Sequence, residues 1–249
     1  MRLHNKVALV TGGSRGIGRA VALAFAREGA DVAITGVSDR VALAQAEQEI
    51  AAAGRQVLAI QADVSQQAEV ERMVRAVVER WGRIDVLVNN AGVIHPTKLE
   101  EINEAQWSAT LAVHLTGVFL CTQAVVPVMK AQGGGKIVNV TAPSALRGSF
   151  GVADYAAAKG GVIAFTRNAA SELKAHNIQV NCISPVAETR MTDALFAFRR
   201  QHLPDTVATF AQAKLVEPEA VAPAFVFFAC ADADYITGQV LAVDGGLTA

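Results

Sequence analysis

Two side chains in the C-terminal half have the spacing of a proton-transfer pair. Tyr155 and Lys159 lie four residues apart in an alanine-rich segment, and on a helix this spacing puts them on one face. A free phenol has a pKa of about 10, and a nearby ammonium favours its ionised form. Such a tyrosine can exchange a proton near neutral pH. A Tyr-x-x-x-Lys match alone is commonplace in helices, so its context decides its meaning.

A glycine-rich turn near the N-terminus has the form of a nucleotide-binding site. Residues 6–11 (KVALVT) predict a strand and residues 14–28 a helix. Between them, glycines let the backbone turn sharply and let a pyrophosphate approach the amides at the helix start. The turn predicts a dinucleotide site, which we assign to Gly12, Ser14, Arg15, Gly16, Ile17 and Gly18.

Short apolar runs and helical segments alternate along the chain. We expect strands at 6–11, 31–35, 57–61, 84–89, 136–141, 178–183 and 239–243, and helices at 14–28, 39–53, 65–81, 104–131, 153–176 and 217–231. Ser65 and Gly82 are expected to cap the third helix. Continuously apolar strands are typical of parallel sheets covered on both faces. The pattern predicts one α/β domain over 1–249, a doubly wound, Rossmann-type sheet of about seven strands with helices on both faces. An α/β barrel would need more regular units than the strandless segment 185–215 allows.

The composition argues against several classes of partner. The net charge is −1 with both signs interleaved, so we expect neither a nucleic-acid nor a membrane partner. Three scattered cysteines predict reduced thiols and a cytoplasmic protein, and no His or Cys spacing predicts a metal. Residues 110–129 carry no Asp, Glu, Lys or Arg over about the length of a membrane span. Polar residues interrupt this stretch, and we expect a mostly buried helix at a subunit contact.

Five motifs in order resemble the short-chain dehydrogenase/reductase family, in particular its 3-oxoacyl-carrier-protein-reductase-like branch. They are the turn at 11–18, Asp63-Val64, the Asn-Asn-Ala-Gly at 89–92, Tyr155 to Lys159, and Gly-Gln at 238–239 with Asp-Gly-Gly at 244–246. The resemblance covers essentially the whole chain. It implies a homo-oligomer, a tetramer built through the long helices and the C-terminal strand. It also implies contacts to a nicotinamide dinucleotide from Asp63, Val64, Asn90, Ala91, Gly92, Tyr155, Lys159 and Pro185.

The chain departs from this family's pattern at three places. His114 stands where the family has an asparagine, and Ala142 stands where its serine donates a hydrogen bond to the reacting carbonyl. Losing one such donor commonly costs about 10²–10³ in rate. Ser144, two residues on, could replace it, and the His114 imidazole could relay protons or simply be packed in a helix contact. The family's Pro-Gly is Pro185-Val186 here, which puts the nicotinamide support in doubt.

The second strand bears on the choice of cofactor. An NAD-preferring site places a carboxylate at the end of this strand, where it would repel a 2′-phosphate. Here residues 35–38 read Thr-Gly-Val-Ser, no acid occurs before Asp39, and Arg15 and Arg40 are near in sequence. We expect NADPH (NADP+) rather than NADH, although Arg15 could equally be a solvated surface residue.

Residues 186–215 fall where the family closes a lid over its substrate. Apolar side chains in this segment indicate a hydrophobic carbonyl or acyl substrate, whereas Arg199, Arg200 and His202 are expected to be solvated; the apolar set is Met191, Leu195, Phe196, Phe198 and Phe210. We therefore predict an NADPH-dependent reductase of a ketone or 3-oxoacyl-type substrate, with Tyr155, Lys159, His114 and Ser144 as catalytic residues. Two alternatives stay open: a catalytically weak subunit that pairs with an active homologous subunit, and a non-redox lyase, isomerase or cyclase.

Overall fold

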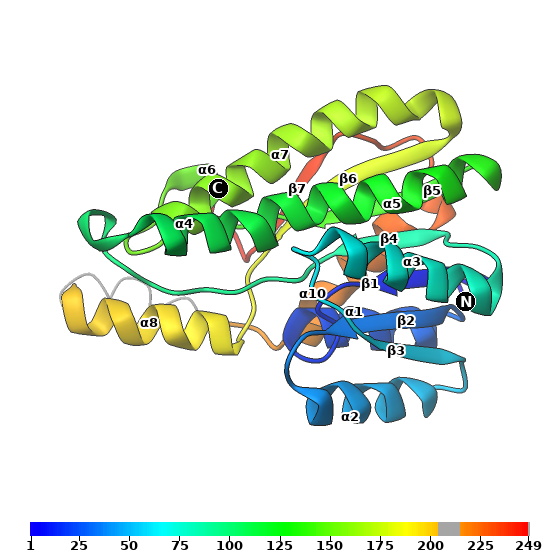
Figure 1. The fold of residues 1–249 in the computed structure, drawn as a ribbon, viewed down its shortest axis with the longest axis horizontal. Helices are drawn as coiled ribbons and strands as arrows, with labels where there is room; N and C mark the ends of the chain where they lie inside the picture. Colours follow the sequence, from blue (N-terminus) through cyan, green and yellow to red (C-terminus); the bar gives the residue numbers. More distant parts are fainter. Residues whose placement is uncertain (204–214, 249) are drawn as a thin grey trace.

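Seven parallel strands form a single sheet in the order β3-β2-β1-β4-β5-β6-β7 (Figure 1). The computed structural model describes residues 1–203 and 215–248. The chain enters at the middle of the sheet and reverses direction between β3 and β4, which confirms the doubly wound prediction. The strands are β1 (Val7–Val10), β2 (Asp31–Gly36), β3 (Val57–Gln61), β4 (Val86–Asn89), β5 (Gly135–Val140), β6 (Ile178–Pro185) and β7 (Val240–Val243).

Helices cover both faces of this sheet. One face packs against α1 (Gly16–Arg27), α2 (Arg40–Ala51) and α10 (Pro218–Ala229), and the buried side chains there include Phe25, Ile34 and Phe225. The other face packs against α3 (Gln67–Trp81), α5 (Gly117–Ala131) and α7 (Ala153–Leu173). The helices α4 (Glu104–Leu111) and α8 (Arg190–His202) extend beyond one end of the sheet (Figure 1). The short helix α6 (Ser144–Arg147), a π-helical turn at Ala112–Thr116 and short 3-10 turns at Leu99–Glu101, Lys174–His176 and Ala231–Ala233 complete the described helices.

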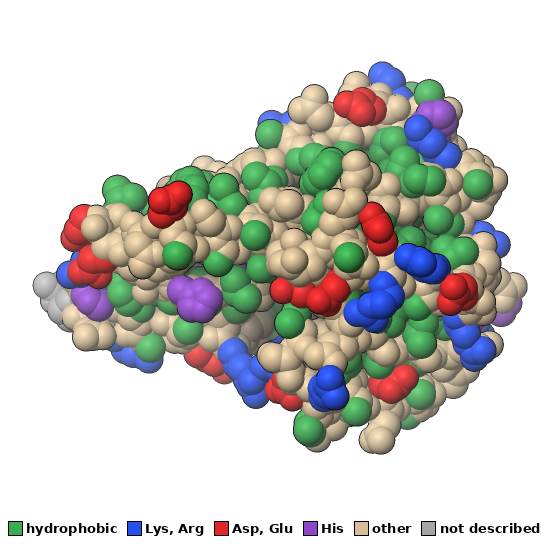
Figure 2. Space-filling view, in the orientation of Figure 1, with side chains coloured by type: hydrophobic (Ala, Val, Ile, Leu, Met, Phe, Trp, Pro, Cys, Tyr) green, Lys and Arg blue, Asp and Glu red, His purple; other side chains and the backbone are tan. Residues whose placement is uncertain are grey.

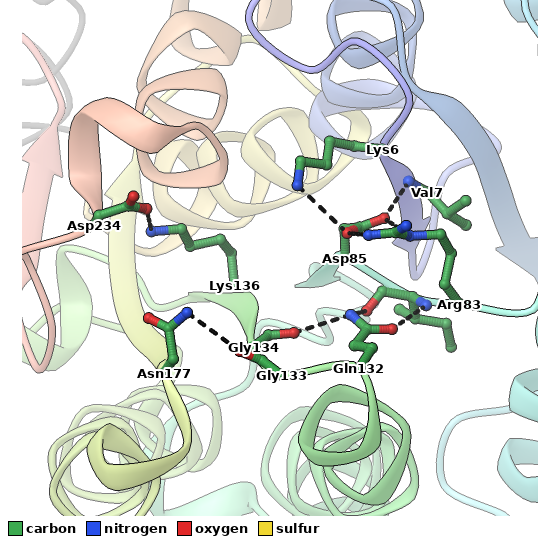
Figure 3. Close-up of polar contacts among 11 residues, drawn as sticks. Lys6, Val7, Arg83, Asp85, Gln132, Gly133, Gly134, Lys136, Asn177 and Asp234 are labelled. Atoms are coloured by element: carbon green, nitrogen blue, oxygen red, sulfur yellow. Dashed lines mark hydrogen bonds and ion pairs between the residues drawn. The ribbon is translucent and has the colours of Figure 1, made fainter.

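Polar contacts fasten the N-terminal ends of the strands, opposite the end where a ligand would bind (Figure 3). The buried carboxylate of Asp85 accepts a hydrogen bond from the Val7 amide at 2.9 Å and an ion pair from Arg83 at 2.5 Å. Lys6 adds a third, longer contact to it at 3.6 Å. Gln132 donates to the carbonyl of Ile84 at 2.7 Å, which joins the end of α5 to the start of β4. These contacts fix the base of the sheet rather than a site.

The third helix begins later than the sequence predicts. Its N-cap is Gln66, and the Ser65 hydroxyl donates to Asp63 at 2.8 Å instead of capping the helix. The expected Ser65 cap was therefore wrong, because a nearer carboxylate takes the hydroxyl. Gly82 does end the helix, in a left-handed conformation.

The long apolar segment forms an unbroken run of helix from Glu104 to Ala131. By length and composition this run could cross a membrane, which is weak evidence, and 39 % of its most apolar window is buried within this chain. The run contains a π-helical turn at Ala112–Thr116. Wider turns of this kind are rare and occur frequently at functional sites. The turn places His114 toward the interior.

Candidate active site

A cavity of about 490 Å³ opens at the carboxyl ends of the strands, between the glycine turn and α8. In the space-filling view, a hollow separates the part that carries α4 and α8 from the rest of the molecule (Figure 2). Eight of the predicted catalytic and cofactor-binding residues line the cavity together: Ile17, Asn90, Gly92, His114, Ser144, Tyr155, Lys159 and Pro185. The other predicted residues are Gly12, Ser14, Arg15, Gly16, Gly18, Asp63, Val64 and Ala91, and they lie in the glycine turn or in the loops after β3 and β4.

The glycine turn fits a pyrophosphate. The N-cap of α1 is Arg15, whose side chain makes no cap bond, so the first-turn amides can serve an anion. The turn is also too tight for side chains. Gly12 has a φ of +66°, and a Cβ on Gly18 would lie 2.3 Å from the Gly12 carbonyl oxygen. Only glycine allows the backbone to come this close.

The loop after β4 is braced against the same turn. The Asn90 side chain donates to the carbonyl oxygens of Thr11 at 3.0 Å and Gly12 at 3.2 Å. The Thr11 hydroxyl in turn accepts from the amides of Asn90 at 3.0 Å and Ala91 at 3.1 Å. Gly92 then passes beneath His114, where a Cβ would lie 2.5 Å from the ring. These contacts fix the loop after β4, which is predicted to lie under the cofactor, against the glycine turn.

The loop after β3 has its own bracing. An Asp63 carboxylate oxygen accepts from both the amide and the hydroxyl of Ser65, at 2.9 and 2.8 Å. Val64 is buried beneath Gly117, where a Cβ would lie 2.8 Å from the valine side chain. Both residues lie beside the end of β3, outside the cavity lining.

Near the end of β2, Arg15 forms an ion pair with a carboxylate. Its guanidinium pairs with Asp39 at 2.6 Å, and Asp39 also accepts from the Ala42 amide at the start of α2. The Ala42 amide and the charges of Arg15 and Arg190 hold the pKa of Asp39 below its usual value. Arg15, predicted to bind the cofactor with a solvated surface position as the alternative, thus forms an ion pair at the edge of the turn, with its side chain 41 % exposed.

Tyr155 and Lys159 share one face of α7, as their spacing predicts, and the Lys159 ammonium lies 5.7 Å from the centre of the phenol ring. Burial raises the pKa of Tyr155, so the phenol is neutral at pH 7 in this structure. The lowering expected from the lysine does not occur, because loss of solvent contact is the only resolved cause of this shift. Burial also lowers the pKa of Lys159 to about 8. The lysine ammonium donates to the Val140 carbonyl oxygen at 2.7 Å, and this bond holds the ammonium at the end of β5.

His114 is a neutral imidazole packed edge-on against Tyr155, with ring centres 4.8 Å apart. Its Nε2 lies 3.0 Å from the Val93 amide nitrogen and 2.6 Å from the Val93 carbonyl oxygen, and the shorter contact favours the tautomer with the proton on Nε2. Burial, with the charge of Lys159, lowers the pKa of His114 to about 3. Its Nδ1 is buried without a hydrogen-bond partner among the described residues. The ring therefore has an unused acceptor at Nδ1, and it does not become positively charged near neutral pH.

The residues that depart from the family pattern line the same cavity. Ala142 lines the cavity and offers no donor, whereas the Ser144 Oγ is buried without a hydrogen-bond partner among the described residues. Pro185 ends β6 and also lines the cavity.

The lid helix α8 corrects one expectation. Arg199 is buried, and its guanidinium donates to the Ser149 hydroxyl and to the Phe150 carbonyl oxygen. Phe198 stacks on Phe150 at 5.9 Å and His202 stacks on Phe198 at 4.3 Å. The prediction that Arg199 is solvated was wrong, because these contacts tie α8 to the loop before α7. Arg200 is exposed as expected, and Phe210 lies outside the described residues.

Comparison with known proteins decides the family. The pattern described as Enoyl-(Acyl carrier protein) reductase matches residues 12–248, nearly the whole chain. The chain belongs to the short-chain dehydrogenase/reductase family. As a member of this family it is an NAD(P)-dependent oxidoreductase that acts on a hydroxyl or carbonyl group.

Named relatives of this short-chain dehydrogenase/reductase are reductases and dehydrogenases. A 3-oxoacyl-(acyl-carrier-protein) reductase from Synechocystis sp. is 41 % identical over 98 % of both chains. The subunit BbsD of (2S)-((R)-hydroxy(phenyl)methyl)succinyl-CoA dehydrogenase from Thauera aromatica is 40 % identical over 99 % of this chain and 98 % of its own. Among solved structures, levodione reductase superposes with a TM-score of 0.91 at 34 % identity, covering 99 % of both chains. Carveol dehydrogenase from Mycobacterium avium, in complex with NAD, gives 0.91 at 31 % identity over 98 % of both.

Among the residues that line or border this oxidoreductase's cavity, Thr189, Arg147 and Arg199 were not predicted from the sequence to lie there. Thr189 caps α8 through a reciprocal pair with Thr192, and its methyl group lies 3.5 Å from where a Cβ on Gly16 would stand. The threonine pair three residues apart was a readable cap signal. Arg147 and Arg199 line the cavity from α6 and α8, and neither carries a local pattern that reveals this.

Proposed function

We propose that this short-chain dehydrogenase/reductase reduces a ketone or 3-oxoacyl-type carbonyl with NADPH, and that Tyr155 donates the proton. The observation that carries the proposal is the position of the neutral Tyr155 phenol and the Lys159 ammonium in the cavity beside the glycine turn. A nicotinamide dinucleotide bound beside the glycine turn would supply the hydride for this reduction. Tyr155 gives its proton to the carbonyl oxygen, and the product is an alcohol.

Lys159 serves this step by its charge. With a pKa of about 8 it is mostly protonated at pH 7, so a positive charge lies near the phenolate that remains after proton transfer. Its bond to the Val140 carbonyl keeps that charge in place. Ser144 is the proposed replacement for the missing serine, because its buried hydroxyl can donate to the carbonyl oxygen. His114 is proposed to assist as a hydrogen-bond acceptor at Nδ1.

The preference for NADPH is supported by charge at the end of β2. Arg15 lies at the glycine turn, and Arg190 is close enough to act on the same carboxylate, Asp39. A 2′-phosphate would take over the Arg15 guanidinium from Asp39 and form charge-assisted hydrogen bonds. The carboxylate of Asp39 opposes this preference, because it would repel a 2′-phosphate. The ratio of kcat/KM with NADPH to kcat/KM with NADH, compared between wild type and Arg15→Gln, measures whether Arg15 or Asp39 has the larger effect.

The test is oxidation of NADPH and NADH by the purified protein across ketones and 3-oxoacyl thioesters, with Tyr155→Phe alongside. We expect turnover that falls by about 10²–10⁴ in Tyr155→Phe, because one positioned proton donor is lost. Cofactor binding, followed by NADPH fluorescence, should change little in this variant. Tight NADPH binding by wild type with no turnover of any carbonyl would overturn the proposal.

A second function is favoured by Ala142 and by a relative that is itself named as a subunit. In this case the chain would bind cofactor and stabilise an active homologous partner. Activity that appears only after mixing with such a partner would support it. A homogeneous homo-oligomer with full activity would exclude it.

A further inference from the structure

A buried carboxylate lies directly before Tyr155 in the first turn of α7. Only 3 % of Asp154 is exposed, and the residue lies outside the cavity lining. The Thr110 hydroxyl donates to its Oδ2 at 2.9 Å and the Gln106 side-chain amide at 3.1 Å. The backbone amide of Tyr155 donates to its Oδ1 at 2.8 Å. Both carboxylate oxygens therefore accept hydrogen bonds, and one of these bonds comes from Tyr155 itself.

These hydrogen bonds join two helices that meet beside Tyr155. Thr110 lies near the end of α4, just before the π-helical turn that carries His114. The His114 ring packs edge-on against the Tyr155 ring, with ring centres 4.8 Å apart. The first turn of α7 is thus attached to the helix run of α4 at two points. The Asp154 carboxylate binds it at the backbone, and the imidazole contacts it at the phenol.

The loop after β4 shares this anchor. The Gln106 Nε2 that donates to Asp154 also donates to the His95 carbonyl oxygen at 3.1 Å, and the Gln106 Oε1 accepts from the Thr97 hydroxyl at 3.2 Å. The Thr97 amide donates to the Gly151 carbonyl oxygen at 2.9 Å, just before α7 begins. One chain of hydrogen bonds therefore connects the loop after β4, the helix α4 and the start of α7.

The position of the carboxylate at the start of a helix explains how it is accommodated. Burying a carboxylate is unfavourable unless hydrogen bonds compensate for the lost water. The first amides of a helix have no partner within the helix, and the helix dipole favours a negative charge there. The N-cap of α7 is Val152, which makes no side-chain cap bond. Asp154 therefore supplies the bond that the N-cap lacks, and it fixes the turn that carries Tyr155.

We propose that Asp154 is a positioning residue for Tyr155: its carboxylate fixes the first turn of α7 against α4 and so holds the phenol at the cavity wall. Because Asp154 lies outside the cavity lining, it acts through Tyr155 rather than on the substrate. A displacement of about 1 Å in a reacting group can lower a rate about 10²-fold. The kinetic test of this inference rests on the proposed role of Tyr155, and a spectroscopic test does not.

The kinetic test is a double-mutant cycle of Asp154→Ala and Tyr155→Phe on a ketone that wild type reduces. Asp154→Ala should lower kcat about 10–100-fold with little change in KM, because the proton donor is misplaced. In the Tyr155→Phe background it should have almost no further effect, because the group that it positions is gone. Asp154→Asn, which keeps an acceptor oxygen, should recover most of the loss. Unchanged kcat in Asp154→Ala, or effects that multiply in the double variant, would overturn the proposal.

A second variant and a matched control separate positioning from general damage to α7. Thr110→Val removes one donor from the carboxylate, should also lower kcat, and keeps the test decisive if Asp154→Ala fails to fold. Thr166→Val is the control: Thr166 is buried further along the same helix, where its hydroxyl accepts from Asn139 at 2.9 Å and donates to the Val162 carbonyl oxygen at 2.8 Å. It should lower the free energy of unfolding without lowering kcat. Equal losses of kcat in Thr166→Val and Thr110→Val would overturn the proposal.

Fluorine NMR locates the phenol without any turnover. Tyr155 and Tyr235 are the two tyrosines of the chain, so in a Tyr235→Phe background a fluorotyrosine label reports Tyr155 alone. Its resonance should shift or broaden in Asp154→Ala and Thr110→Val and stay in place in Thr166→Val. This pattern supports the positioning role even if wild type reduces no carbonyl, which would overturn only the reductase proposal. A resonance that stays in place in Asp154→Ala overturns the positioning role and leaves the reductase proposal intact.

Discussion

At the residue scale, Ser144 Oγ lies buried in the cavity wall while Ala142 occupies the family's serine position. If Ser144 supplies the hydrogen bond, Ser144→Ala should lower kcat by about 10²–10³, the usual cost of one such donor. Adding Ala142→Ser to this variant should restore much of the loss, because the hydroxyl returns to the family's position. Steady-state kinetics on the same ketone measure both changes. Unaltered kcat in Ser144→Ala would remove Ser144 from the reaction.

His114 gives a prediction about stability rather than rate. In the unfolded chain its pKa is about 6.5, whereas in the folded protein burial lowers it to about 3. Between these values the unfolded state binds more protons, so the free energy of unfolding decreases as the pH falls. From pH 6.5 to 4.5 this contribution is about 2–3 kcal/mol. Urea unfolding at both pH values measures this. The free energy of unfolding should fall less with pH in His114→Asn than in wild type, by this amount. The same decrease in both proteins would contradict the prediction.

At the element scale, Asp85 joins the start of β1 to the start of β4, and its side chain is only 8 % exposed. Asp85→Ala leaves the Val7 amide without its acceptor and should lower the free energy of unfolding by about 2–3 kcal/mol. Glu49→Ala is the control, because it breaks only the exposed pair with Arg19 and should cost less than about 1 kcal/mol. Chemical denaturation distinguishes these values. Equal effects of the two substitutions would show that the base of the sheet does not depend on this carboxylate.

Elements were predictable from sequence where a local pattern fixes them. All seven strands follow from continuous apolar runs, and the end of β3 was matched to the residue. The π-helical turn at Ala112–Thr116 was not, because it depends on how the helix packs against α7 and the sheet. The same reason explains Arg199, whose burial depends on a loop 49 residues earlier in the chain. In the site, the spacing of Tyr155 and Lys159 was readable, but the neutral states of Tyr155 and His114 follow from burial that no motif reports.

At the scale of the whole molecule, charged side chains and exposed apolar side chains are distributed differently over the surface. Acidic and basic side chains are interspersed over the face seen in Figure 2, without one sign dominating it. By contrast, exposed apolar side chains lie on α5 and on the edge strand β7. Phe119 is 42 % exposed beside Phe165, and Leu241 is 39 % exposed. An apolar helix face and an open sheet edge both favour pairing with another chain.

The sequence prediction of an oligomer built through the long helix can be tested at Phe119. We expect Phe119→Glu to yield a smaller species than wild type in analytical ultracentrifugation, because burying an unpaired carboxylate in an apolar contact is costly. Val41→Glu is the matched control: Val41 is more exposed, at 69 %, but lies on α2, on the other face of the sheet from α5. If both variants sediment like wild type, the α5 face is not the subunit contact. If wild type is itself a monomer that assembles only with a homologous chain, Phe119→Glu should abolish that mixed assembly while Val41→Glu preserves it.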